Sequence, residues 1–221
     1  MERNRKRKMA ISIGLLAMFL LWTAAVSCVD VQAIGPCGSS VGFATVNRLV
    51  HRLTGVHLDL YTLTDWLSLV PVGSCVGFGI LGLVQWILRK GLRKVDFSIL
   101  VLGGFYVVTV AVFLLFEIVP VNYRPILIEG KPEVSYPSST TLLVMCVLPT
   151  SVMQLNSRIR NRLLKNLISV VLMGFMVFMV IGRLVSGVHW VTDIIGGALL
   201  SGGLVMLYHC FSTRPSHHCA S

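Results

Sequence analysis

Charged residues are scarce in this chain. Only 13% of its 221 residues are Asp, Glu, Lys or Arg, while 55% are hydrophobic. A soluble domain usually has about a quarter of its residues charged. The composition therefore excludes an ordinary soluble protein and indicates an integral membrane protein.

Patterns typical of metal sites are also missing. The six cysteines form no Cys-x-x-Cys pair and no metal-ligand spacing with histidine, and the nine acidic residues form no metal-binding cluster. We therefore expect no metal and no cofactor. Cys28 and Cys37 are predicted to lie together outside the membrane, where they are either a disulfide or two small, partly buried side chains.

Long hydrophobic runs are what the sequence does contain. A transmembrane helix needs about 20 mostly apolar residues, and six segments qualify: 9–29, 64–88, 97–119, 138–156, 166–185 and 190–211. The predicted fold is an all-α integral membrane protein with six transmembrane helices in a single domain, residues 1–221. A cleaved signal peptide is the alternative for the first run, but its length favours an uncleaved helix.

Basic residues lie mainly on one side of these predicted spans. The net charge is +10, and Lys and Arg cluster in 3–8, 89–94 and 158–165. If the N-terminus is cytoplasmic, these clusters and Arg214 place 14 of the 19 basic residues on the cytoplasmic side. This is the positive-inside pattern. It accounts for the charge by topology, so no nucleic-acid partner is expected.

The same topology assigns the remaining segments. Residues 1–8 are a basic cytoplasmic N-terminus, and residues 212–221 are a cytoplasmic tail. Residues 30–63 are the longest stretch between spans and lie on the extracytoplasmic side. Within them, apolar positions recur with a roughly helical period in 41–55, which predicts an interfacial helix.

Three ionisable residues lie around the boundary of the last two predicted spans. Arg183, His189 and Asp193 occur in the stretch GRLVSGVHWVTDIIGG. Ionisable residues at a membrane boundary are costly and indicate a functional site. On a helix, His189 and Asp193 share one face, so the carboxylate can orient the imidazole and stabilise its cation. Arg183 adds a planar cation suited to phosphate oxygens. The set indicates phosphoryl transfer, with a structural capping network as the alternative.

A second polar segment is predicted on the same membrane face. Residues 117–141 contain four of the eight prolines, which favours a stiff, non-helical backbone. The fourth span then begins with Ser138, Ser139 and Thr140. A helix N-terminus with hydroxyl groups is a favourable anion-binding site. With Arg124 they predict a phosphate cradle at the extracytoplasmic ends of the third to sixth helices. An ordinary helix cap and a snorkelling cation are the alternatives.

These residues resemble the type 2 phosphatidic acid phosphatase family, whose site is shared with vanadium haloperoxidases. The family has three patterns, K-x6-R-P, P-S-G-H and S-R-x5-H-x3-D. The chain has Glu117-x6-Arg124-Pro125, then Pro137-Ser138-Ser139-Thr140, then Gly182-Arg183-x5-His189-x3-Asp193. The resemblance covers about residues 60–211.

The resemblance implies a role for each matching position. His189 would be the nucleophile that forms a phosphohistidine, and Asp193 would orient it. The phosphate oxygens would be held by Arg124, Arg183 and the helix start at Ser138, Ser139 and Thr140. No metal or cofactor is needed. The implied activity is that of a membrane phosphatase or phosphotransferase for a lipid phosphate or pyrophosphate, with the lipid bilayer and the lipid phosphate as its partners. The sequence leaves the oligomeric state open.

Two positions depart from the family pattern. Thr140 replaces the histidine that serves the family as general acid, and such help is worth about 10²–10⁴-fold in rate. Glu117 replaces a lysine and becomes a candidate acid or charge partner, with simple exposure to water as the alternative. A catalytically impaired pseudophosphatase that binds lipid phosphate headgroups is therefore the alternative function.

Overall fold

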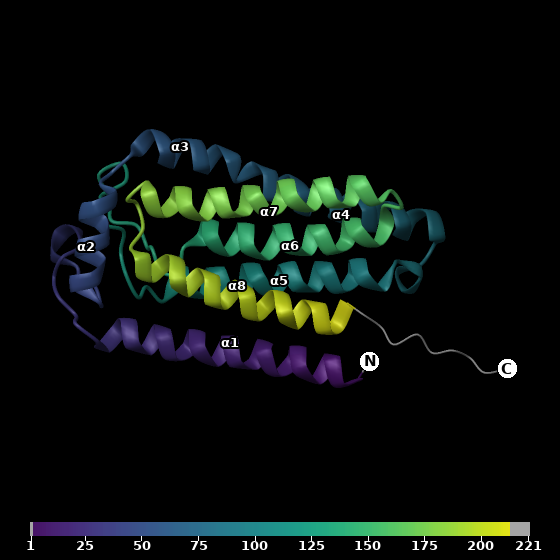
Figure 1. Ribbon diagram of the computed structural model, residues 1–221, viewed down its shortest axis with the longest axis horizontal. Coiled ribbons are helices and arrows are strands. Elements are labelled where there is room, and N and C mark those ends of the chain that lie inside the picture. The colour runs from purple at the N-terminus through teal and green to yellow at the C-terminus, as the bar shows by residue number, and fades with distance from the viewer. Residues whose placement is uncertain (1, 213–221) are drawn as a thin grey trace.

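The computed structural model describes residues 2–212, which form a bundle of long helices with shorter helices at one end (Figure 1). The elements are α1 (Glu2–Cys28), η1 (Pro36–Gly38), α2 (Ala44–Thr54), α3 (Leu58–Leu67), α4 (Leu69–Arg89), η2 (Leu92–Lys94), α5 (Phe97–Ile118), α6 (Ser139–Arg158), α7 (Arg162–Val185) and α8 (Val191–Ser212). Within residues 2–212 there is no extended strand, only isolated β-bridges in the loops. The predicted cytoplasmic tail lies outside the described residues except for Ser212.

Six helical segments are long and apolar enough to cross a membrane. They are Arg3–Cys28, Leu58–Arg89, Phe97–Ile118, Ser139–Arg158, Arg162–Val185 and Val191–Ser212. The predicted all-α, multi-pass membrane fold is therefore confirmed. The second segment starts earlier than the sequence predicted and consists of α3 and α4, which meet at Ser68. Asp65 lies within this segment, and its carboxylate is paired with an arginine of α7.

The centre of the bundle is formed by α6 and α8. About half of each span is buried in the protein, compared with 6% of the span made by α3 and α4. Small residues allow this close packing, as is common between membrane helices. A Cβ atom added at Gly203 of α8 would lie 2.7 Å from Leu16 Cδ2 of α1. The two central helices thus fix the positions of the loops at their ends.

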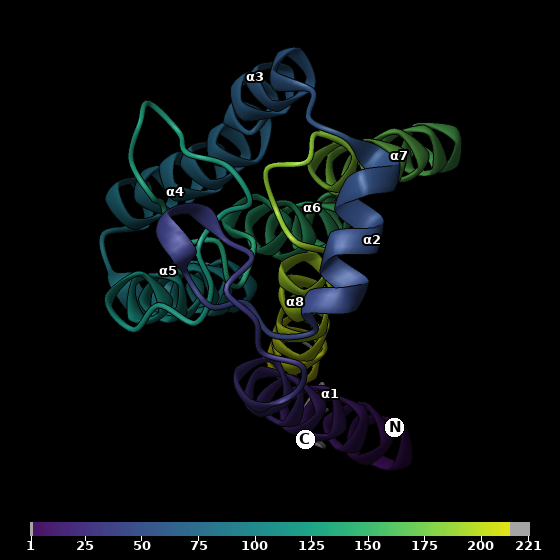
Figure 2. The same ribbon diagram turned by 90° about the vertical axis from the view of Figure 1, so that its left-hand side faces the viewer.

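The two ends of the bundle differ in character. The three basic clusters lie at one end, at the start of α1, in the turn from α4 to α5 and in the turn from α6 to α7 (Figure 1). The opposite end contains α2, α3 and the long loop of residues 119–138 (Figures 1 and 2). The segregation of basic residues predicted from the sequence is therefore present in the fold.

The helix predicted within residues 41–55 is α2, which crosses the start of α8 (Figure 2). Asn47 holds it there, because its buried side-chain amide donates to the Gly42 carbonyl at 2.8 Å and to Thr192 Oγ1 at 3.1 Å. Nearby, Cys28 and Cys37 are both exposed and unpaired, so of the two alternatives for this pair the disulfide is not formed, and the side chains are not partly buried either.

Candidate functional site

The candidate nucleophile and its carboxylate partner lie where the chain passes from α7 to α8. His189 is 3% exposed and Asp193 is fully buried. His189 Nδ1 lies 3.7 Å from Asp193 Oδ2, which is too long for a hydrogen bond but within ion-pair distance for a protonated imidazole. The expectation that both residues share a helix is wrong, because α8 begins at Val191. The turn before it nevertheless brings the two side chains together.

Both oxygens of the Asp193 carboxylate are held by the protein. Oδ2 accepts a hydrogen bond from the Trp190 backbone N–H at 3.0 Å, and Oδ1 accepts one from Asn122 Nδ2 at 3.2 Å. The Trp190 indole N–H in turn donates to the Tyr123 carbonyl at 2.8 Å. These contacts tie the loop after α5 to the start of α8 and fix the carboxylate beside His189.

The start of α6 lies against the same turn. The Ser138 backbone N–H donates to the Asp193 carbonyl at 3.1 Å. Its hydroxyl caps α6 by accepting from the Thr141 N–H, so capping is one role of this residue. Ser138 and Thr140 are buried and Ser139 is half-buried. The predicted cradle residues thus begin α6 next to the start of α8.

The two predicted phosphate-binding arginines share one aromatic ring. The guanidinium carbon of Arg183 lies 4.9 Å from the centre of the Tyr61 ring, and that of Arg124 lies 5.6 Å from it. Arg183 also donates from Nη2 to Asp65 at 2.8 Å. Arg124 Nε lies 3.0 Å from a carboxylate oxygen of Glu133, which is within ion-pair distance, but its N–H forms no hydrogen bond. The Arg183 side chain is buried at 3% exposure and that of Arg124 is 11% exposed, whereas their partners Asp65 and Glu133 are 60% and 43% exposed.

Six buried nitrogen atoms in this region have no hydrogen-bond partner among the described residues. They are Nε and Nη1 of Arg124, Nε and Nη1 of Arg183, and both ring nitrogens of His189. Buried polar groups are nearly always satisfied, because leaving one unpaired costs about 1–3 kcal/mol. Donors on two buried cations suit an anion that supplies several acceptor oxygens.

The surroundings of His189 favour its neutral form. Burial lowers the pKa of the imidazole, and Asp193 raises it in part, while the positive charges of Arg124 and Arg183 lower it further. The net result is a pKa below the ordinary value of 6.5. A neutral imidazole has a free electron pair on one ring nitrogen, as a nucleophile requires.

Glu117 is not brought to this cluster. It lies exposed in the last turn of α5, and its side chain forms no hydrogen bond or ion pair with another residue of the described part. Its role as an acid or charge partner stays a prediction without a supporting contact. Within residues 2–212, no group of three or more His, Cys, Asp or Glu side chains is arranged to hold a metal ion.

Three residues that contact the candidate site residues were not predicted from the sequence. Tyr61 and Asp65 come from α3, and Asn122 comes from the loop after α5. Asp65 carried a usable signal, since an ionisable residue in an apolar run calls for a partner. Nothing in the sequence distinguished Tyr61 or Asn122.

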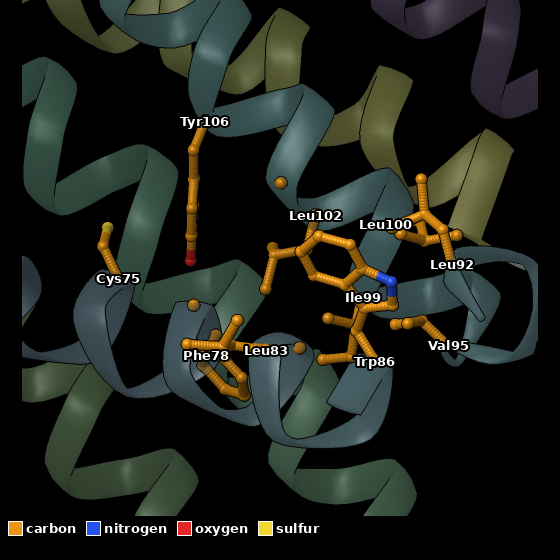
Figure 3. A pocket seen from close by; sticks show the side chains of 13 residues that line it. Cys75, Phe78, Leu83, Trp86, Leu92, Val95, Ile99, Leu100, Leu102 and Tyr106 are labelled. Carbon is orange, nitrogen blue, oxygen red and sulfur yellow. The ribbon is translucent and has the colours of Figure 1, made fainter. Parts of the chain in front are cut away.

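A separate apolar cavity of about 330 Å³ lies between α4 and α5 (Figure 3). Its lining includes Phe78, Trp86 and Leu102, with the Cys75 thiol and the Tyr106 hydroxyl at one end. None of the candidate residues lines it, so it is distinct from the candidate site.

Comparison with known proteins agrees with the motifs. Residues 109–216 match the family model of the PAP2 superfamily. This match and the structural likeness described next support a divergent member of this superfamily, so the resemblance predicted from the motifs is confirmed. No curated protein sequence matches the chain.

The fold is similar to a solved structure, that of the first transmembrane PAP2 type phosphatidylglycerolphosphate phosphatase from Bacillus subtilis. The two chains are 20% identical, and the similarity covers 90% of this chain and 94% of the other, with a TM-score of 0.56. At this identity the likeness establishes the fold. The family match begins within α5, so α1–α4 lie outside it.

Proposed function

We propose that the protein is a membrane phosphatase or phosphotransferase that acts on a lipid phosphate or pyrophosphate. The observation that carries this proposal is the set of buried nitrogens on Arg124, Arg183 and His189 that have no hydrogen-bond partner. Two guanidinium groups beside a neutral imidazole suit a phosphate group that is held by its oxygens and attacked at phosphorus. The match to the PAP2 superfamily model supports the same chemistry.

In the proposed reaction, His189 attacks through Nε2, because Asp193 lies on the Nδ1 side of the ring. The nitrogen–phosphorus bond forms, and the bond from phosphorus to the leaving oxygen breaks. The lipid leaves as an alkoxide that takes a proton from water, or, from a pyrophosphate, as a lipid phosphate. Asp193 stabilises the positive charge that the imidazole acquires, while the arginines stabilise the charge on the equatorial phosphate oxygens. Water, or an alcohol in a transferase, then attacks phosphorus and releases His189.

The residue at position 140 favours a substrate whose leaving group needs no proton. Thr140 stands where the family pattern has a histidine, and a hydroxyl is a poor acid near neutral pH. A lipid alkoxide needs a proton as it leaves, whereas a phosphate leaving group is stable without one. We therefore propose that lipid pyrophosphates react faster than lipid monophosphates.

The distribution of charge supports an extracytoplasmic site. The candidate residues occupy the end of the bundle opposite the basic clusters, and basic residues favour the cytoplasmic side (Figure 1). The substrate phosphate would then be reached from the outer leaflet, with the N-terminus in the cytoplasm.

The test is to trap the covalent intermediate. Purified protein is mixed with phosphatidic acid, phosphatidylglycerol phosphate or a polyprenyl pyrophosphate, each labelled in the phosphate, and acid-labile phosphohistidine is measured with product release. Replacement of His189 by Ala should abolish both. A His57→Ala variant is the matched control, because the His57 side chain is exposed and bonds only to the Thr54 carbonyl. Hydrolysis that survives His189→Ala would contradict the proposal.

The replacement at Thr140 favours a second function, a pseudophosphatase that binds lipid phosphate headgroups without hydrolysing them. The same experiment separates the two. Binding of the labelled lipid without phosphohistidine or released phosphate supports the pseudophosphatase.

A further inference from the structure

We infer that α3 is part of the phosphate site, with Tyr61 acting as a positioning residue that holds Arg124 and Arg183 side by side. This inference rests on the proposed binding of phosphate. It concerns a helix that precedes residue 109, where the family match begins, so the family motifs assign no role to it.

The first support is the geometry of the ring. Both guanidinium carbons lie within the distance of about 6 Å at which a cation is attracted to an aromatic ring. The two arginines come from distant parts of the chain, one from the loop after α5 and one from the last turn of α7. Two cations held against one ring repel each other. A ring that attracts both offsets part of this repulsion and sets where each guanidinium plane lies.

The second support is Asp65, one helical turn after Tyr61. It accepts from Arg183 Nη2 at 2.8 Å and leaves Nε and Nη1 of the same guanidinium without a partner. A planar group held at one corner by a carboxylate and against an aromatic ring has little freedom to turn. Its remaining N–H groups are thereby kept available for phosphate oxygens.

The third support is the firm attachment of α3 to the end of α7. Thr64 is fully buried, and a Cβ atom added at Gly182 would lie 2.9 Å from its Cγ2 atom. The His57 N–H also donates to the Ser186 carbonyl at 3.0 Å. Gly182 directly precedes Arg183, so the close contact between the two helices places Tyr61 and Asp65 beside that arginine.

The experiment measures the binding of inorganic phosphate without turnover. A ligand that binds only the folded protein raises its unfolding temperature by an amount that depends on its dissociation constant. Phosphate is titrated into purified protein, and the unfolding temperature is followed for wild type, Tyr61→Phe and Tyr61→Leu. Trp66→Leu is the matched control, since Trp66 is an exposed aromatic residue of the same helix.

The aromatic ring of Tyr61, and not its hydroxyl group, should determine the affinity for phosphate. Tyr61→Leu should weaken phosphate binding about tenfold, while Tyr61→Phe should retain it within about twofold. Trp66→Leu should bind phosphate as wild type does. If Tyr61→Leu unfolds without phosphate, Tyr61→Met replaces it, with the same expectation.

Two results would overturn the role of Tyr61. One is wild-type phosphate binding in Tyr61→Leu, and the other is equal loss in Tyr61→Phe, which would assign the effect to the hydroxyl. Failure of the proposed function would give different experimental results. A wild-type protein whose unfolding temperature does not respond to phosphate contradicts the phosphate site itself, whereas unchanged hydrolysis in His189→Ala contradicts the chemistry alone.

Discussion

Asp193 Oδ2 lies 3.7 Å from His189 Nδ1, on the side of the imidazole away from the nitrogen proposed to attack. The carboxylate cannot turn freely, because its two oxygens accept hydrogen bonds from Asn122 and from the Trp190 backbone. This arrangement fixes the carboxylate beside the imidazole. In the proposed reaction it provides a negative charge where the imidazole becomes positive.

Replacing Asp193 by Asn tests that charge. The amide keeps the size of the side chain but loses the negative charge, so the phosphorylated imidazole is less stabilised. We expect kcat to fall about 10²–10⁴-fold, as when the orienting acid of a catalytic triad is neutralised. The measurement is steady-state hydrolysis of the best lipid substrate.

Asn122→Ala is the control for this change. It removes one of the two contacts to the carboxylate and keeps the charge. Its kcat should fall much less than that of Asp193→Asn. Equal kcat values for Asp193→Asn and wild type would show that the carboxylate does not assist the reaction.

The pH dependence of kcat/KM tests the protonation state of His189. Attack needs the neutral imidazole, so activity is lost as the pH falls through the pKa of His189. Burial and the nearby arginines lower that pKa. The fall of kcat/KM on the acidic side of its pH profile, called the acidic limb, should therefore lie below the ordinary value of 6.5. The value of kcat/KM reports groups of the free enzyme, which is the state described here.

Removing one positive charge near His189 should shift the acidic limb of the kcat/KM profile in a known direction. Arg124→Gln takes away a charge that lowers the pKa of His189, so the pKa rises and the limb moves to higher pH. The control is Arg48→Gln, which removes an exposed arginine bonded to Gln32. A limb that moves to lower pH in Arg124→Gln would contradict the assignment to His189.

The sequence allowed the spans and the core of the candidate site to be predicted for local reasons. A span depends on the length of an apolar run, and the motif with Arg183, His189 and Asp193 depends on spacing within eleven residues of one another. The contacts of Tyr61 and Asn122 depend instead on packing between distant elements. The close approach of Gly182 to Thr64 decides that α3 lies beside Arg183, and no sequence period encodes it.

Restoring a histidine at position 140 tests the leaving-group argument. Thr140→His supplies an acid near the start of α6, so hydrolysis of a lipid monophosphate should rise at least about tenfold. Hydrolysis of a pyrophosphate should change less, since its leaving group needs less protonation. Glu117→Lys alone should have little effect, because Glu117 is exposed outside the cluster. A rise confined to Glu117→Lys would place that residue in the site after all.

Two natural cysteines allow the membrane orientation to be tested. Cys28 ends α1 and Cys37 lies in η1, which follows α1 at the same end of the bundle as the candidate site, and both are exposed, whereas Cys146 and Cys210 are buried. If this end is extracytoplasmic, a thiol reagent that cannot cross membranes should label the protein in intact cells. The double variant Cys28→Ser, Cys37→Ser should lose that labelling and keep its activity, because neither thiol contacts the candidate residues. Labelling of wild type that appears only after the membrane is permeabilised, and disappears in the double variant, would place the site on the cytoplasmic face.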